Sequence, residues 1–379
     1  MRRTIFEDVH DDFRQSVRGF LQAEALPHTE AWEQAGMVDR SFLRKAAKQG
    51  LVGFAAPEEY GGAGLTDFRF NCVLDEEVAY TGTVGDNLNL TNDILAPYLL
   101  ELTTEEQRAR WLPRWTSGDL VPAIAMTEPG AGSDLRGIAA NATWQGDHYT
   151  LTGSKTFVSS GIQADLVIVA ANVVQDGVKG LGLFAVEAGA EGFERGRKLS
   201  KVGRRAQDTA ELFFENVVVG PENVIGTPGE GLRNLMRNLA QERLSMAVVA
   251  VAAAERALEI TLEYTRDRQA FGQSIGSFQH SRFTLAELAT DVQVGRIYVD
   301  RCIAEHTAGN LTAVEAASAK LWTTELQFRV IDRCMQFHGG YGYMEEYEIA
   351  RMWKDARVTR IYGGTSEIMK EIVGRSLAL

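Results

Sequence analysis

The chain has 379 residues, of which 45% are hydrophobic, so it is long enough to bury a large core and to form about two or three domains. Its formal net charge of -12, with no block of lysine or arginine, argues against a nucleic-acid surface, which needs clustered cations. No apolar run approaches the roughly 20 residues that cross a bilayer, and the acidic N-terminus resembles neither a signal peptide nor a transit peptide, so we expect a cytoplasmic protein without a membrane span.

Helical periodicity dominates the first third of the chain. From residue 6 to about 117, apolar residues recur at three- and four-residue spacing, as at Phe13 and Val17. Gly118 then closes the region as a helix breaker. These signals predict a helical N-terminal domain over residues 1–120.

The middle of the chain carries short runs with period-two alternation and turns between them. The segment 144–149 has the composition of a hairpin turn. Strands are expected at 166–171, 181–186 and 210–219. This pattern predicts a β domain over residues 121–228.

Helical patterns return in the last part of the chain. We expect helices at 232–265, 279–308, 312–339 and 365–377. The segments are long and amphipathic, which is typical of a helical bundle. The predicted C-terminal domain covers residues 229–379.

Cysteine and histidine usage gives no metal site. Cys72, Cys302 and Cys334 are odd in number and far apart, so neither a disulfide framework nor a zinc pair is available, and buried free thiols are expected. His338 has no second histidine at ligand spacing, which favours a structural role.

Three glycine-rich loops remain after the common catalytic signatures are excluded. The chain has no P-loop, no HExxH motif, no GxSxG elbow and no complete dinucleotide fingerprint. The loops lie at 126–134, 338–343 and 363–366, each beside hydroxyl-bearing residues. Such loops expose backbone N–H groups that can hold an anion or the polar edge of a heterocycle. Taken singly, each loop also fits an ordinary turn.

In their order along the chain and in their amino-acid sequences, these loops resemble those of the acyl-CoA dehydrogenase family. The matching strings are AMTEPGAGSD at 125–134, GSKTFVSSG at 153–161, DRQAFGQSIGSFQ at 267–279, QFHGGYGY at 336–343 and IYGGTSEIMKEIVGR at 361–375. The similarity spans nearly the whole chain and is greatest to the long-chain type. It implies an α+β, mainly helical fold: an N-terminal helical domain, a middle β-barrel or sandwich domain and a C-terminal four-helix bundle, assembled as a homotetramer or dimer of dimers.

The resemblance implies FAD as the cofactor. By position, Thr127 corresponds to a partner of the flavin pyrimidine edge, and Phe157 and Ser159 correspond to an aromatic wall and a hydroxyl near flavin N5. Ser159 departs from the threonine often found there. The full set implied for this part of the cofactor is Ile124, Met126, Thr127, Gly132, Ser133, Phe157, Val158 and Ser159.

A second set of FAD contacts is implied by the C-terminal motifs. Arg268, Phe271 and Gln279 match residues that reach the cofactor of a neighbouring subunit, and Arg268 is chemically suited to phosphate because its planar guanidinium can form paired hydrogen bonds. A surface arginine in a charged turn is the alternative. The remaining members are Gln336, Phe337, Gly339 and Gly340 at the adenine end, and Thr365, Ser366 and Glu367 near the pyrophosphate and adenosine. Glu367 stands where the family often has an amide.

The implied reaction is α,β-dehydrogenation of an acyl-CoA thioester to the trans-2-enoyl thioester. It needs a base for the α proton, and a buried carboxylate is suitable because burial raises its proton affinity. Many family members carry this glutamate directly after the tyrosine of the IY-GT motif, where this chain has Gly363. In the long-chain and isovaleryl branches the base comes from a helix with a QERL-like string, which matches Glu242. Without the resemblance, Glu242 also fits a solvated helix carboxylate and Gly363 a turn with positive φ.

Substrate contacts are implied for the neighbourhood of these two positions. They are Ser133, Ala240, Gln241, Arg243, Tyr362, Gly363 and Gly364, with the amide of Gly363 facing the thioester carbonyl. The helix around 86–93 should approach the distal acyl pocket, and its polarity argues against a purely long alkyl substrate. Side chains that point to solvent are one explanation of this polarity, and a branched or functionalised acyl group is the other. An electron-transfer flavoprotein is the implied electron acceptor.

Three alternatives stay open. The thioester could be carried by an acyl-carrier protein instead of CoA. A flavin-dependent monooxygenase could use the same fold, although it needs no catalytic glutamate. A non-catalytic helical scaffold is the third, but it has no reason to keep loops that match flavin contacts.

Overall fold

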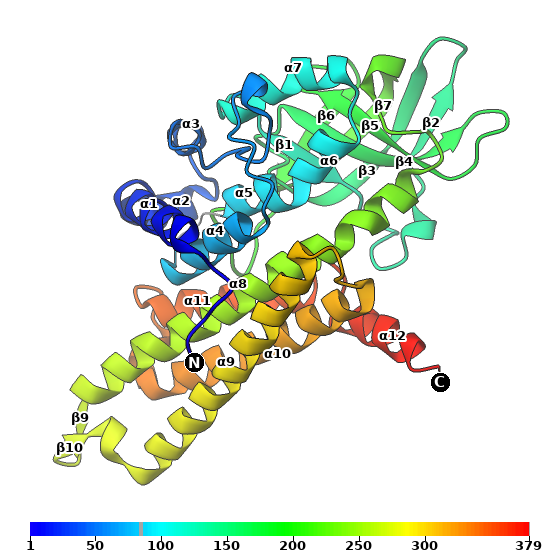
Figure 1. The fold of residues 1–379 in the computed structure, drawn as a ribbon. Coiled ribbons are helices and arrows are strands. Elements are labelled where there is room, and N and C mark those ends of the chain that lie inside the picture. Colours follow the sequence, from blue (N-terminus) through cyan, green and yellow to red (C-terminus); the bar gives the residue numbers. More distant parts are fainter. Residues whose placement is uncertain (83–85, 379) are drawn as a thin grey trace.

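The computed structural model describes residues 1–82 and 86–378, and the chain forms helices at both ends with a sheet between them (Figure 1). The N-terminal region contains α1 (Asp8–Glu24), α2 (Thr29–Ala35), α3 (Arg40–Lys48), α4 (Arg69–Tyr80), α5 (Asp86–Asn89), the π-helical segment Leu90–Leu95, α6 (Ala96–Glu101) and α7 (Glu105–Thr116). The apolar positions that predicted helix α1, Val17 and Phe20 among them, are buried.

The middle region is one mixed sheet. Its strands are β1 (Pro122–Ala125), β2 (Asn141–Trp144), β3 (Tyr149–Ser159), β4 (Leu166–Val174), β5 (Leu181–Glu187), β6 (Phe193–Lys198), β7 (Thr209–Val219) and β8 (Val224–Ile225). They run in the order β6-β7-β3-β2-β4-β5-β8, and β1 pairs in parallel with the first half of β4. The hairpin expected at 144–149 is confirmed, because Trp144 pairs with Tyr149.

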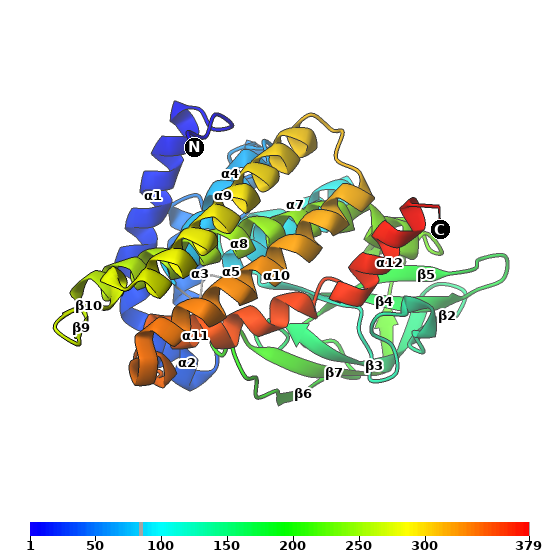
Figure 2. The ribbon, with the colours of Figure 1, turned by 90° about the horizontal axis from the view of Figure 1, so that it is seen from below.

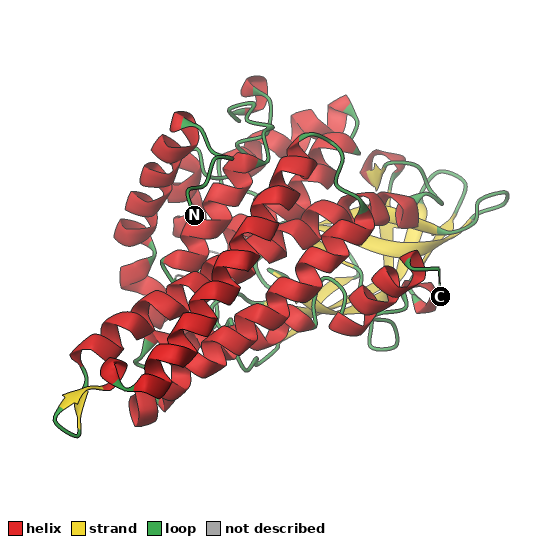
Figure 3. Ribbon diagram, turned by 60° about the horizontal axis from the view of Figure 1, so that its bottom comes forward, coloured by secondary structure: helices red, strands yellow, loops and turns green. Residues whose placement is uncertain are grey.

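The C-terminal region is a bundle of long helices (Figure 3). It comprises α8 (Gly231–Asp267), the two-stranded hairpin β9 (Gln269–Ala270) and β10 (Gln273–Ser274), α9 (Gln279–Thr307), α10 (Ala313–His338), α11 (Glu348–Ala356) and α12 (Ser366–Ser376). Four of these helices match the predicted ranges to within two residues. The sequence pattern did not indicate α11, whose nine residues are short for a periodicity signal.

Helix α8 is the element that joins the three regions. Its 37 residues make it about 55 Å long, and its alanine-rich centre lets neighbouring helices approach closely. It packs against α4, α9 and α10 and begins beside β5. Figure 2 shows α8 running from the sheet to the β9–β10 hairpin, which projects at the opposite end of the bundle.

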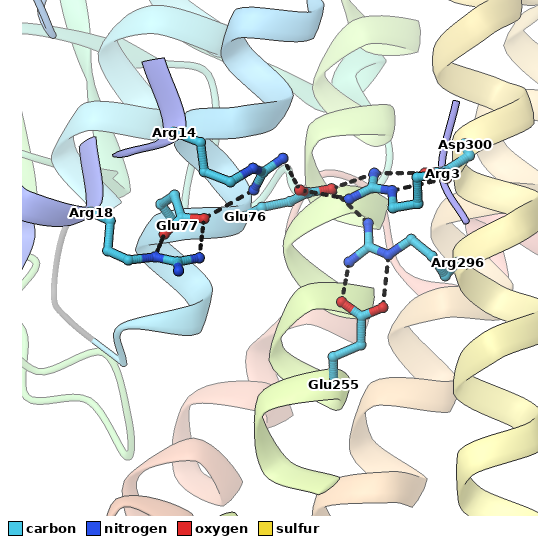
Figure 4. A network of polar contacts seen from close by, with 8 residues as sticks. All are labelled: Arg3, Arg14, Arg18, Glu76, Glu77, Glu255, Arg296 and Asp300. Carbon is cyan, nitrogen blue, oxygen red and sulfur yellow. Dashed lines mark hydrogen bonds and ion pairs between the residues drawn. The ribbon is translucent and has the colours of Figure 1, made fainter. Parts of the chain in front are cut away.

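A network of buried ion pairs fixes the N-terminal helices to this bundle (Figure 4). Glu76 of α4 accepts hydrogen bonds from Arg3 at 2.7 Å and from Arg296 of α9 at 2.7 Å. Arg296 also pairs with Glu255 of α8. Burial raises the pKa of Glu76, but Arg296 and Arg3 outweigh burial and lower it to about 2. Glu76 is therefore held ionised, and α4 is held against α8 and α9.

The fold class, the three cysteines and His338 agree with the sequence-based expectations. The α+β, mainly helical class is confirmed, and all three cysteines are buried free thiols. His338 is buried, stacks on Tyr264 and contacts the Thr261 hydroxyl at 3.2 Å, as a structural residue does. Among the described residues, no helix combines the length and apolar character of a membrane span.

Candidate active site

Glu242 lies in the buried part of α8, beside a cavity of about 190 Å³. Its side chain is 4% exposed. Ser245, Met246 and Val249 follow at helical spacing on the same face and line the same cavity. The solvated-surface alternative for Glu242 is therefore wrong.

The surroundings of Glu242 are suited to a proton acceptor. The Tyr98 hydroxyl donates to Glu242 Oε1 at 3.3 Å, and Arg243 is the adjacent cation. Burial raises the pKa of Glu242 more than Tyr98 and Arg243 lower it, and the result is about 7. A carboxylate with this pKa is close to optimal for accepting and releasing a proton near neutral pH.

The sheet supplies the opposite wall of the cavity. Residues contributed by the end of β1 and by β3 are Ile124, Met126, Thr127, Thr156, Phe157, Val158 and Ser159. The two segments are tied together because the Thr156 N–H donates to the Thr127 carbonyl at 2.9 Å. Lys155 donates to the Met126 carbonyl and to Glu128, so a buried ion pair fixes the loop after β1.

Phe157 is held in an unusual conformation at this wall. It has φ +58° at an irregularity in the pairing of β3 with β7, between Lys155 and Val158. Its side chain is 67% exposed although it lines the cavity. A large aromatic side chain that is exposed by a strained bulge is typical of a ligand-binding position.

The loop before α12 forms the third side of the cavity through Tyr362 and Gly363. Gly363 has φ +61°, and a Cβ there would lie 2.3 Å from Cε of Met246. The buried Lys320 donates to the Tyr362 carbonyl at 2.7 Å and to that of Gly364. Burial and then Arg243 lower the pKa of Lys320 to about 8. The left-handed backbone thus favours glycine at 363, whereas the end of the Met246 side chain would only have to shift to admit a Cβ.

Part of the second predicted FAD set lies far from Glu242. Arg268 follows α8 directly, 26 residues after Glu242, which corresponds to about 39 Å along the helix. Arg268 lines a separate depression with Phe337, Gly339 and Gly340, and its guanidinium lies 6.0 Å from the Tyr341 ring. Phe271, at the tip of the projecting hairpin, is 96% exposed. Gln279, at the start of α9, and Gln336, near the end of α10, are also exposed.

The other predicted site residues do not line the Glu242 cavity. Gly132 and Ser133 are exposed in the loop after β1, and Ala240 and Arg243 are on other faces of α8. Gln241 donates to the Asp93 carbonyl at 2.9 Å. Thr365 caps α12, Ser366 donates to Glu325, Glu367 is exposed in the first turn, and Gly364 adjoins Gly363. The roles of these residues stay predictions.

Sequence reasoning did not identify several residues of this site. Tyr98, Lys320 and Met246 contact Glu242 or the Gly363 loop, but they lie in other helices or are ordinary core types. No local pattern reports such contacts. Asn89 and Asp93, in contrast, belong to the polar stretch at 86–93, and both line the cavity.

Comparison with known proteins assigns the chain to a family. Models of the acyl-CoA dehydrogenase N-terminal, middle and C-terminal domains match residues 7–119, 123–217 and 229–378. The chain belongs to the acyl-CoA dehydrogenase family. The mitochondrial long-chain specific acyl-CoA dehydrogenase of Rattus norvegicus is 46% identical over 99% of this chain and 88% of its own length.

Solved structures of the family agree with this assignment. An acyl-CoA dehydrogenase from Geobacillus kaustophilus superposes with a TM-score of 0.96 at 45% identity and covers 100% of both chains. An acyl-CoA dehydrogenase from Bacillus anthracis complexed with FAD has a TM-score of 0.89 at 30% identity and covers 98% of this chain and 67% of that one. The family resemblance and the FAD-dependent acyl-CoA dehydrogenase class are confirmed.

Proposed function

We propose that Glu242 is the base that takes the α proton from an acyl thioester in this acyl-CoA dehydrogenase. The observation that carries the proposal is a carboxylate that is 4% exposed, has a pKa of about 7 and lines a cavity together with Gly363. Position 363 has a left-handed backbone and is occupied by glycine, so it supplies no carboxylate to this cavity. We therefore assign the base to α8.

The residues around the cavity fit FAD. Phe157 offers an exposed aromatic face, and Thr127 and Ser159 offer hydroxyls on the same wall. When bound, FAD would accept the hydride that leaves the β carbon. The protein's part is to hold the thioester between this wall and Glu242, and to place an amide such as that of Gly363 where negative charge develops on the thioester oxygen.

A complete site on this proposal needs a second copy of the chain. Arg268 is about 39 Å from Glu242 along α8, too far to join the same cavity, and Phe271 projects on an exposed tip. We infer that this tip and the neighbouring Gly339–Gly340 turn contact the cofactor of another subunit in a homotetramer. An electron-transfer flavoprotein is the proposed acceptor, on the family resemblance.

Anaerobic flavin spectroscopy tests the activity. The purified protein is mixed with saturated, branched and functionalised acyl-CoA thioesters, and flavin absorbance is followed. Bleaching with at least one of them is expected. Bleaching only with the corresponding acyl-carrier-protein thioesters would show that the substrate is carried by that protein and not by CoA. If no thioester bleaches the flavin, but substrate is hydroxylated when the flavin is first reduced with dithionite and oxygen is then admitted, the monooxygenase alternative is favoured.

A further inference from the structure

One wall of the Glu242 cavity is polar. Apart from Asn87, which lines a separate small cavity, the described polar side chains of the 86–93 stretch form two groups. Thr91 accepts a hydrogen bond from the Trp115 indole at 2.7 Å, and Asn92 bonds to backbone groups, so both serve the core. Asn89 and Asp93 line the cavity instead. The side chain of Asp86 lies outside the described residues.

Asp93 presents an acceptor that the protein does not satisfy. Its side chain is 1% exposed, and Oδ1 accepts from Asn71 Nδ2 at 2.6 Å. Oδ2 has no hydrogen-bond partner. Ser245 lines the same cavity and is 5% exposed, and its hydroxyl lowers the pKa of Asp93, although it forms no hydrogen bond of normal geometry. A buried acceptor without a donor is unfavourable. Asp93 Oδ2 and the Ser245 hydroxyl would therefore gain from a hydrogen bond to a ligand.

A second carboxyl group, that of Asp75, lies beside Asp93. Asp75 of α4 is fully buried, accepts from Asn89 Nδ2 and interacts with the Asp93 side chain. Two buried carboxyl groups in contact share a proton, because both cannot ionise at low cost. Among the described cavity-lining residues, the single cation is Arg204, which lies over the Tyr362 ring at 5.5 Å. The lining therefore carries two carboxyl groups, Asp93 and Glu242, against one cation.

The backbone holds Asp93 in a fixed position relative to Glu242. Asp93 belongs to the π-helical segment Leu90–Leu95, a conformation that is rare and is frequent at functional sites. The Gly53 N–H and the Leu88 carbonyl both bond to Asn92, which fixes that turn. The Asp93 carbonyl accepts from Gln241, the residue next to the proposed base.

We propose that the acyl group of the natural substrate carries a hydrogen-bond donor, a hydroxyl or an ammonium group, beyond its β carbon, and that Asp93 and Ser245 receive it. This inference rests on the proposed function, because it places the acyl chain in the cavity of Glu242. A plain alkyl chain offers no donor to Asp93 Oδ2 or to the Ser245 hydroxyl. A donor-bearing chain completes the missing contacts.

The test compares acyl-CoA thioesters that are matched in length. For chains of about four to eight carbons, the plain, ω-hydroxy, ω-amino and ω-methoxy thioesters are each mixed anaerobically with the FAD-loaded protein. The apparent second-order rate of flavin reduction is measured. At one chain length the hydroxy or amino compound should exceed both the plain and the methoxy compound by about 10- to 100-fold, the range for a buried charge-assisted hydrogen bond. Which of the two donors wins identifies the group.

Two variants and a control complete the test. Asp93→Leu should reverse the preference in favour of the plain chain, and Ser245→Ala should reduce it, so the inference does not depend on one variant folding. Thr91→Val removes a hydroxyl from the same segment but outside the cavity, and should keep the wild-type ratio. If plain chains match or exceed their donor-bearing partners at every length, the inference is wrong while the dehydrogenase survives. If no thioester bleaches the flavin, the proposed function itself fails.

Discussion

The Tyr98 hydroxyl donates to Oε1 of Glu242 at 3.3 Å, and thereby joins the N-terminal helix α6 to the proposed base on α8. The contact opposes the effect of burial, since a hydrogen bond to the carboxylate favours its ionised form. Tyr98 is a positioning residue here, because it touches the base and does not line the cavity. Its hydroxyl lowers the pKa of Glu242, against the larger effect of burial.

Removing the carboxylate should abolish proton abstraction without removing the cofactor. Glu242→Gln keeps the shape of the side chain, so FAD and acyl-CoA should still bind. The rate of flavin reduction should fall by about 100- to 10,000-fold, the usual contribution of a general base. Glu263→Gln changes an exposed glutamate on the same helix and should behave as wild type. Near-normal reduction by Glu242→Gln would refute the assignment.

The rate of flavin reduction should rise with pH through about 7. The sign follows from the chemistry, because only the ionised form of Glu242 accepts a proton and its pKa is raised to about 7. In Tyr98→Phe the lost hydrogen bond leaves burial less opposed, so the midpoint of the pH profile should move to higher pH. Single-turnover reduction measured from pH 5 to 10 checks both statements. An unchanged midpoint in Tyr98→Phe would show that the contact does not tune the base.

Filling position 363 should destabilise the protein. Gly363→Ala imposes a left-handed backbone on alanine, which costs roughly 1–2 kcal/mol, and brings its Cβ against Met246. A loss of about 1–3 kcal/mol is expected in urea unfolding. Gly363→Ala combined with Met246→Ala should recover the steric part in a double-mutant cycle. Gly19→Ala, in a helix with nothing near its Cβ and no positive φ, should be neutral or stabilising.

Arg268→Gln should weaken FAD retention by about 10- to 100-fold, because it removes a charge-assisted contact to phosphate. Gel filtration with the flavin absorbance of the eluted protein measures this. Arg266→Gln alters an exposed arginine in the same turn and should retain the cofactor. Equal retention by the two variants would argue against the role of Arg268.

Mixed assemblies show whether Arg268 serves the partner's site. Chains with Arg268→Gln are co-expressed with chains carrying Glu242→Gln, each with its own affinity tag. If Arg268 acts across subunits, some sites combine an intact Glu242 with an intact Arg268, and activity partly returns. If it acts within its own chain, the purified hybrids stay inactive.

Glu76→Gln should cost about 3–5 kcal/mol of stability at pH 7, because it removes the buried carboxylate that Arg3, Arg14 and Arg296 share and leaves each of them one acidic partner. The pKa of Glu76 falls from 4.5 to about 2 on folding, so its contribution is complete above pH 4.5 and is lost as pH falls toward 2. The difference from wild type should therefore shrink by about 2 kcal/mol between pH 7 and pH 3. Urea midpoints at both values measure it.

An exposed ion pair provides the contrast for this prediction. Glu371→Gln breaks a contact with Arg375 in the last helix, where both side chains are more than half exposed. It should change stability by less than about 0.5 kcal/mol. If the two variants cost the same at pH 7, burial does not govern the strength of the network.

The chain's own sequence determined the long helices, the β region between them and the likeness to a flavin-dependent dehydrogenase. The spacing of apolar residues predicts helices such as α8 and α10, because the pattern repeats many times along each helix. Short glycine-rich motifs predict loops such as 363–366. The domain limits at 120 and 228 stay predictions. The nine-residue α11 was missed because so short a helix gives little periodicity.

Only the tertiary structure decided what the polar and charged residues do. Burial and the Tyr98 contact give Glu242 a pKa near 7, and both depend on helices that are distant in sequence. The same packing places the Thr91 side chain in the core and the Asp93 side chain at the cavity, although the two residues are only two positions apart. Sequence patterns report local preferences, whereas solvent access and partner distances are set by how separate elements meet.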